Sequence, residues 1–161
     1  MNLTTGNKAP DFMLKDTEGN DVKLSDFNGT KNILLLFFPL AFTGVCTKEM
    51  CYMRDNLAPY NDMNVEVMGI SVDSFFVLKE FKKARGLNFT LLSDFNRDVS
   101  EAYGALHDDF FGMKGVSKRA AFLIDTDGII RYAEVLDNPS NLPDFDAALD
   151  VASRLAVTSV K

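Results

Sequence analysis

The feature that most constrains the fold is an unbroken run of six apolar residues, 33–38 (ILLLFF), which leads directly into a loop beginning at Pro39. Such a run matches a strand buried on both faces, as in sheets that helices cover on each side. The loop reaches Cys46 where we expect a helix to begin. Because the single histidine, His107, lies far along the chain, nucleophilic chemistry at this loop must use a thiol that no neighbouring histidine activates.

Length and charge narrow the class of protein. The 161 residues suit one domain spanning 1–161. The net charge of −6 argues against nucleic acid as a partner, because a phosphate backbone attracts basic proteins. No apolar stretch is long enough to cross a membrane, and the N-terminal residues lack the apolar core of a secretory signal. We therefore expect a cytoplasmic protein, and in that reducing compartment the two cysteines, Cys46 and Cys51, are more often catalytic than structural.

The spacing of apolar residues predicts an alternating order of strands and helices. The predicted strands are 11–14, 22–24, 33–38, 65–71, 89–92, 120–124 and 129–135, and the predicted helices are 48–60, 77–85, 99–103 and 142–155. Glycine-containing turns at 16–20 and 125–128 indicate two hairpins. This order predicts an α/β, thioredoxin-like fold: a central mixed β-sheet flanked by helices, with an N-terminal hairpin.

The segment around Cys46 contains what a reactive thiol needs. A thiol is a strong nucleophile only as a thiolate, and the unpaired N–H groups and positive dipole end of a helix start favour that anion. Arg119 stands immediately before the apolar strand 120–124; if this strand lies beside the first buried strand, the guanidinium reaches the sulfur. Thr43 is placed to hydrogen-bond across the turn, while Pro39 stiffens the loop and offers no N–H.

These residues resemble the active-site pattern of the peroxiredoxins. The order is Pro39-x-x-x-Thr43-x-x-Cys46, with Arg119 before a Phe-Leu-Ile-Asp strand. The resemblance covers nearly the whole chain, and the loop 37–46 is similar to that of the alkyl hydroperoxide reductase E type.

The resemblance implies a thiol peroxidase in which Cys46 is the peroxidatic residue. Cys46 is then expected to attack a hydrogen or organic hydroperoxide and become a sulfenic acid, while Pro39, Thr43 and Arg119 build the peroxide site. Glu49 occupies the acidic position usual in the family, where it either supports the site or simply complements the helix start. The resemblance implies no metal, haem or flavin cofactor. The expected partners are the hydroperoxide and a thioredoxin-, glutaredoxin- or small-thiol-type reductant.

The E type also implies a homodimer formed through loops around the active site. Phe42, Phe110 and Phe111 are the apolar candidates for this contact. The pair 110–111 suits the core or the rim of a substrate site as well. We expect the nearby His107 to cap a loop or to lie in solvent, because it has no neighbours with which to bind a metal.

The second cysteine, Cys51, is the candidate resolving residue, and its role decides how the catalytic cycle closes. Its spacing from Cys46 is not that of a Cys-x-x-Cys dithiol. On a continuous helix five residues rise about 7.5 Å, which sets the two α-carbons roughly 8.5 Å apart, beyond the ~7 Å limit for a disulfide. An intrachain bond therefore requires the start of the helix to unwind. The Q type of peroxiredoxin is similar in carrying its resolving cysteine at this spacing.

Two alternatives to intrachain resolution remain open from the sequence. An external thiol resolves the sulfenic acid if Cys51 is only a buried helix residue, which gives a one-cysteine peroxidase. A peroxide-sensing redox protein is the rival function, in which oxidation of Cys46 alters binding to a partner. Turnover distinguishes them, since a peroxidase consumes many equivalents of peroxide for each chain.

Overall fold

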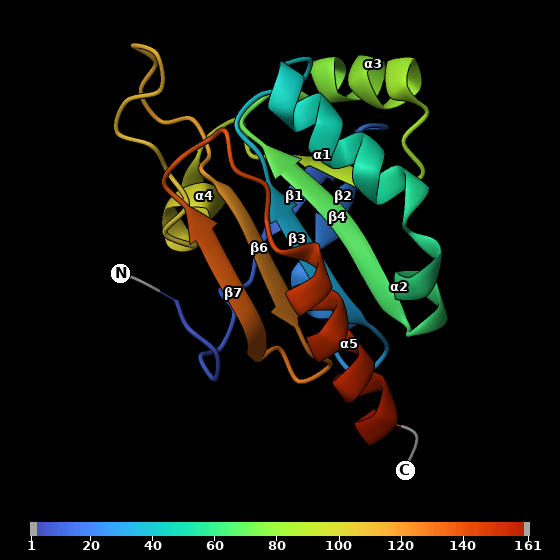
Figure 1. Cartoon of the computed structure of the whole chain (residues 1–161). Helices are drawn as coiled ribbons and strands as arrows, with labels where there is room; N and C mark the ends of the chain where they lie inside the picture. Colours follow the sequence, from blue (N-terminus) through green and yellow to red (C-terminus); the bar gives the residue numbers. More distant parts are fainter. Residues whose placement is uncertain (1–2, 160–161) are drawn as a thin grey trace.

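The protein is described here by a computed structural model that covers residues 3–159; the ends of the predicted domain, residues 1–2 and 160–161, lie outside it. Seven strands form one sheet in the order β2-β1-β5-β4-β3-β6-β7 (Figure 1). The strands are β1 (Met13–Asp16), β2 (Asp21–Lys23), β3 (Asn32–Phe37), β4 (Val65–Ser71), β5 (Thr90–Ser93), β6 (Arg119–Ile124) and β7 (Ile130–Leu136). The helices are α1 (Gly44–Asp55), α2 (Ala58–Asp62), α3 (Phe75–Arg85), α4 (Asp98–Ala102) and α5 (Phe145–Ser159), with a 3₁₀ turn η1 (Leu24–Phe27).

The sheet is mixed, as the sequence predicts. β3, β4 and β5 are parallel neighbours, whereas β6 runs antiparallel to β3, and β7 continues that edge. The N-terminal hairpin β1–β2 adds to the opposite edge by pairing with β5. The thioredoxin-like arrangement is thus confirmed, and β3 lies inside the sheet, which agrees with its wholly apolar sequence.

Alternating residues of β3 supply two separate cores, one on each face of the sheet. Leu34 and Leu36 belong to the cluster that α1, α2, α3 and α5 cover. Ile33 and Leu35 belong to the second cluster, which includes Tyr103 and residues of η1 and α4. Side chains of a strand point to opposite faces in turn, so a strand with no polar member needs cover on both sides.

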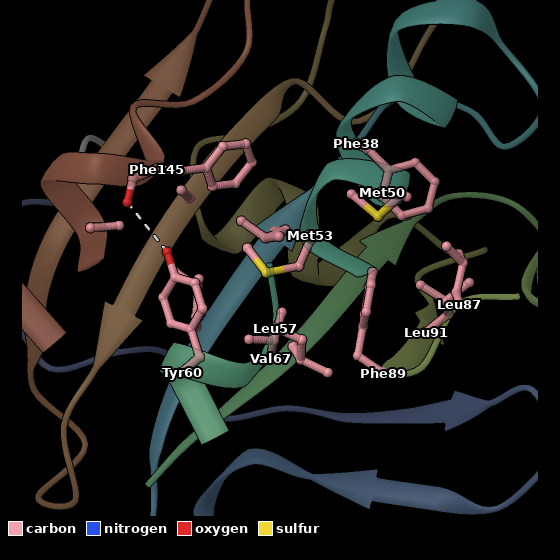
Figure 2. Packing of buried hydrophobic residues seen from close by; sticks show 14 of the residues in the cluster. Phe38, Met50, Met53, Leu57, Tyr60, Val67, Leu87, Phe89, Leu91 and Phe145 are labelled. Atoms are coloured by element: carbon pink, nitrogen blue, oxygen red, sulfur yellow. Dashed lines mark hydrogen bonds between the residues drawn. The ribbon is translucent and has the colours of Figure 1, made fainter. Parts of the chain in front are cut away.

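The first core fixes helix α1 on the sheet (Figure 2). Met50 and Met53 are fully buried, and Figure 2 shows them among the apolar and aromatic side chains of this cluster. The Tyr60 hydroxyl donates to the Phe145 carbonyl over 3.3 Å and joins α2 to the start of α5. Burying each methionine contributes about 1.5–3 kcal/mol, so the part of α1 that carries them is firmly held.

The boundaries of two predicted helices are wrong by more than two residues. The helix predicted over 48–60 is in fact two helices, because α1 begins earlier, at Gly44, and ends at Asp55. Pro59 does not end a helix; it lies in the first turn of α2, where its missing N–H leaves no bond unmade. The last helix begins at Phe145 rather than at 142, and the Asp144 carboxylate accepts the Ala147 N–H at its start. The predicted strands differ from the observed ones by at most two residues at either end.

Candidate active site

Cys46 lies in the first turn of α1, directly after the loop that leaves β3, and is 1% exposed. Two hydrogen bonds fix this loop: Ala41 donates its N–H to Asp73 Oδ2, and the Thr43 hydroxyl donates to the Leu40 carbonyl, both over 2.7 Å. Thr43 is the N-cap of α1, but its side chain does not cap the helix. The first N–H groups of α1 therefore keep their capacity to donate to an anion.

Arg119 reaches Cys46 because β6 lies next to β3 in antiparallel register. Phe37, the last residue of β3, pairs with Ala120, so the start of β6 meets the end of β3. Arg119 Nη2 lies 3.3 Å from Cys46 Sγ. The same Nη2 donates to the Pro139 carbonyl over 2.9 Å. The guanidinium is therefore held in one orientation, with a hydrogen bond directed at the sulfur.

Glu49 is the second partner of Arg119. Arg119 Nη1 donates to Glu49 Oε1 over 2.7 Å, and both side chains are buried. Burial raises the pKa of Glu49 to about 7, although the charge of Arg119 and its hydrogen bond oppose the shift. Burial lowers the pKa of the Arg119 guanidinium, but the interactions with Glu49 and Cys46 outweigh burial, so the pKa of Arg119 is raised overall. Glu49 thus points inward to the cation and does not merely complement the helix start.

Two further predicted site residues, Pro39 and Cys51, lie on the loop before α1 and on α1 itself. Pro39 is buried at the end of β3, at the start of the loop that carries Thr43. Cys51 is half-buried further along α1, which is continuous from Gly44 to Asp55, and both cysteines are free thiols. The continuous helix is the geometry in which we expect no 46–51 disulfide.

The prediction for His107 is wrong. The side chain is buried and its ring packs on Phe110 with centroids 5.4 Å apart. Its Nε2 has no hydrogen-bond partner among the described residues, and burial lowers the pKa of this group. The reason is that the loop before β6 folds back on itself, through bridges between Leu106 and Ser117 and between Phe110 and Met113. Phe111, at the tip of this loop, is 85% exposed.

Two site contacts have no counterpart among the predicted residues. Asp73 follows β4, the strand beside β3, and it accepts from both Ala41 N–H and the Ser71 hydroxyl. An acidic residue just past the end of the neighbouring parallel strand is the signal that points to it. The Pro139 carbonyl, which accepts from Arg119, leaves no such signal because any residue carries that group.

Other kinds of site have little support in the described part of the chain. Among residues 3–159, no group of three or more histidine, cysteine or carboxylate side chains is arranged so that it could hold a metal ion. Within the same residues, no helix combines the length and apolar character that crossing a membrane requires.

A profile of the AhpC/TSA family matches residues 5–133. This chain belongs to that family. It is 40% identical over 135 residues to alkyl hydroperoxide reductase E of Mycobacterium tuberculosis, which covers 83% of this chain and 86% of the relative. It is 38% identical over 140 residues to the chloroplastic 2-Cys peroxiredoxin BAS1 of Spinacia oleracea, covering 81% of this chain and 51% of the relative.

The fold agrees with the family. The crystal structure of peroxidoxin BcpB from Mycobacterium tuberculosis superimposes with a TM-score of 0.85 at 29% identity, covering 95% of this chain and 98% of that one. The predicted peroxiredoxin resemblance is confirmed, and the protein is a thiol-dependent peroxidase.

Proposed function

We propose that Cys46 is the peroxidatic thiol of this peroxiredoxin and that Arg119 activates it. The observation that carries the proposal is the 3.3 Å contact between Arg119 Nη2 and Cys46 Sγ in the first turn of a helix. A fixed cation and a helix start both favour a thiolate over a thiol. Cys51 lies on the same helix, but beyond its first turn.

The reaction is a displacement at oxygen. The Cys46 thiolate attacks the nearer oxygen of the hydroperoxide, the S–O bond forms as the O–O bond breaks, and the departing oxygen takes a proton to leave as water or alcohol. Negative charge moves from sulfur to the departing oxygen. Arg119 and the uncapped N–H groups of α1 are placed to stabilise that charge, while the buried Pro39 and the Thr43 turn shape the loop around it.

We further propose that Cys51 resolves the sulfenic acid within the chain. The cysteines are five residues apart on one helix, so the first turns of α1 must unwind for the sulfurs to meet. Water is released when the disulfide forms, and a dithiol or small-thiol reductant then returns both thiols. Direct reduction of Cys46 by an external thiol is the alternative outcome.

A homodimer through the loops beside the site is part of the proposal. Phe42, on the loop before α1, is 49% exposed, and Phe111, on the loop before β6, is 85% exposed. Both loops lie at the end of the sheet where α1 begins (Figure 1). We propose that a second copy of the chain covers these two side chains. Sedimentation of wild type and of Phe111→Ser tests the dimer, and a monomeric wild type contradicts it.

We also propose that the chain acts as a single peroxiredoxin domain in the cytoplasm. All seven strands belong to one sheet, which supports a single domain. Both cysteines are free and one of them is needed as a thiol, which suits a reducing compartment.

The experiment that tests the catalytic proposal compares two matched variants. Cys46→Ser is expected to abolish peroxide consumption, whereas Cys51→Ser is expected to keep the first oxidation step. Mass spectrometry after one equivalent of peroxide identifies the product on each chain. Retention of peroxide consumption in Cys46→Ser contradicts the role of Cys46, and a single equivalent consumed in the presence of reductant favours a sensor.

A further inference from the structure

Two acidic groups compete for one buried cation at the start of α1. Arg119 contacts Cys46 Sγ with Nη2 and Glu49 Oε1 with Nη1, and all three side chains are at most 2% exposed. Arg119 is the charged group that acts on the Glu49 carboxyl. His107 is also buried, and burial, with the charges of Lys118 and Arg119, lowers its pKa, so it adds no second cation at neutral pH.

A charge count shows why this arrangement is unstable with both acids ionised. A thiolate and a carboxylate beside one guanidinium leave a net negative charge in a site closed to solvent, which carries a large desolvation penalty. The second carboxyl oxygen, Glu49 Oε2, is buried and has no hydrogen-bond partner among the described residues. Burying an ionised carboxylate with one oxygen left without a hydrogen bond is costly in free energy. A neutral carboxyl is less costly to bury in the same site.

We propose that Glu49 holds a proton while Cys46 is a thiolate, and that it releases this proton when Cys46 is oxidised. The inference rests on the proposed peroxidatic role of Cys46. Glu49 acts through Arg119 and is therefore a positioning residue rather than a catalytic one. In the reduced enzyme the guanidinium compensates the negative charge of the thiolate. Once Cys46 is a neutral sulfenic acid, the guanidinium compensates the charge of the Glu49 carboxylate.

The proton balance follows from this exchange. The thiolate, the hydroperoxide and one proton give the sulfenic acid and water or an alcohol. Glu49 loses one proton in this step and the departing oxygen gains one, so the solvent supplies none overall. In Glu49→Gln the side chain cannot release a proton, and the solvent must supply it.

The pH at which the exchange can be observed depends on the pKa of Glu49 in two states, with Cys46 oxidised and with Cys46 as a thiolate. Burial raises the pKa of Glu49 to about 7, and a thiolate beside the same guanidinium raises it further. Above pH 7 an ionised Glu49 is therefore expected when Cys46 is oxidised, and a protonated Glu49 when Cys46 is a thiolate. About pH 8 separates the two states.

Infrared difference spectroscopy of the intact protein tests this directly. At about pH 8, reduced wild type is expected to show a protonated-carboxyl C=O band that disappears with one equivalent of hydrogen peroxide. The band should be absent from Cys46→Ser, which cannot form a thiolate but keeps Glu49 and Arg119. Glu49→Gln is the control that assigns the band.

A pH indicator in weak buffer gives the second readout. Oxidation is expected to take up no proton from solvent in wild type and about one per Cys46 in Glu49→Gln. A reduced wild type without the band, together with uptake of about one proton, overturns the inference while leaving the peroxidase intact. Absence of any reaction between Cys46 and peroxide contradicts the proposed function instead.

Discussion

Arg119 and Cys46 are 73 residues apart in the chain and yet share a hydrogen bond of 3.3 Å between Nη2 and Sγ. The contact exists because β6 pairs antiparallel with β3, which brings the first residue of one strand to the end of the other. The sheet therefore positions the cation, and the helix positions the thiol. Both side chains come from regular secondary structure, which favours a preorganised site in the reduced chain.

The first prediction concerns Arg119→Ala. Loss of the cation is expected to slow peroxide attack by about 10²–10³-fold even when the thiolate is fully formed. Arg119→Lys should restore only part of the rate, because an ammonium lacks the two-armed geometry that serves Cys46 and Glu49 together. Stopped-flow kinetics across pH, with circular dichroism to confirm folding, measures both effects.

An unchanged rate constant for the thiolate of Arg119→Ala shows that the arginine is structural. Because Arg119→Ala also leaves Glu49 buried without a cation, the double variant Arg119→Ala with Glu49→Gln is the control for folding. Its rate should remain low although its stability recovers.

The second prediction is a pH dependence of stability that belongs to Glu49. Its pKa in the folded chain, about 7, lies above the ordinary value of 4.5. A raised carboxyl pKa stabilises the folded state fully below the unfolded value, and this contribution is lost as pH rises through the folded value. Relative to Glu49→Gln, a chain with Glu49 should therefore lose about 3 kcal/mol of unfolding free energy between about pH 4.5 and 7.

Urea unfolding in a Cys46→Ser background isolates this effect, because no thiolate then shares Arg119. Other titrating groups cancel in the difference between the two chains. A difference that stays constant from about pH 4.5 to 7 means that Glu49 is ionised in the folded state throughout.

The position of Arg119 could be predicted from the sequence, whereas its second contact was not. The sequence places Arg119 at the site only on the condition that strand 120–124 lies beside strand 33–38, and the pairing of β3 with β6 meets that condition. Glu49 lies three residues after Cys46, so the two share a helix face, and that spacing does favour a common partner. Whether the face points to the sheet depends on where α1 begins, and the boundary predicted at 48 was wrong.

The loops were harder to predict because their contacts are not periodic. His107 is buried by a loop that folds back through two isolated β-bridges. The spacing of apolar residues along the sequence does not predict this pairing. The break between α1 and α2 is similar. Pro59 is compatible with ending one helix or with beginning the next, and only the tertiary position of Tyr60, which bonds to the start of α5, shows which applies.

The third prediction tests how tightly α1 is packed on the sheet. A Cβ added at Gly69 in β4 would lie 2.7 Å from Leu91 Cδ2, 3.3 Å from Phe38 Cε1 and 3.4 Å from Met50 Sδ. Because these neighbours are buried, Gly69→Ala is expected to lower the unfolding free energy by about 1–3 kcal/mol. Gly44→Ala is the matched control, since a Cβ there meets nothing within 4 Å.

Denaturant unfolding of the two glycine variants measures the difference. Gly44→Ala should be at least as stable as wild type, because alanine is favoured over glycine in a helix. Equal stability of Gly69→Ala and wild type shows that the space between β4 and α1 is looser than these distances indicate.

The last prediction concerns Cys51→Ser and the fate of the sulfenic acid. Resolution requires the first turns of α1 to unwind, while Met50 and Met53, both fully buried, hold the turns that follow. Unwinding competes with a second attack by peroxide, so removing Cys51 should increase conversion of Cys46 to sulfinic acid and leave the rate of the first oxidation unchanged. Mass spectrometry over a series of peroxide concentrations measures the conversion, and amide hydrogen exchange of the oxidised wild type should rise over residues 44–49 alone. A wild-type chain that remains a stable sulfenic acid with one equivalent of peroxide, with no 46–51 disulfide, shows that an external thiol resolves Cys46 and that Cys51 serves only to pack the helix.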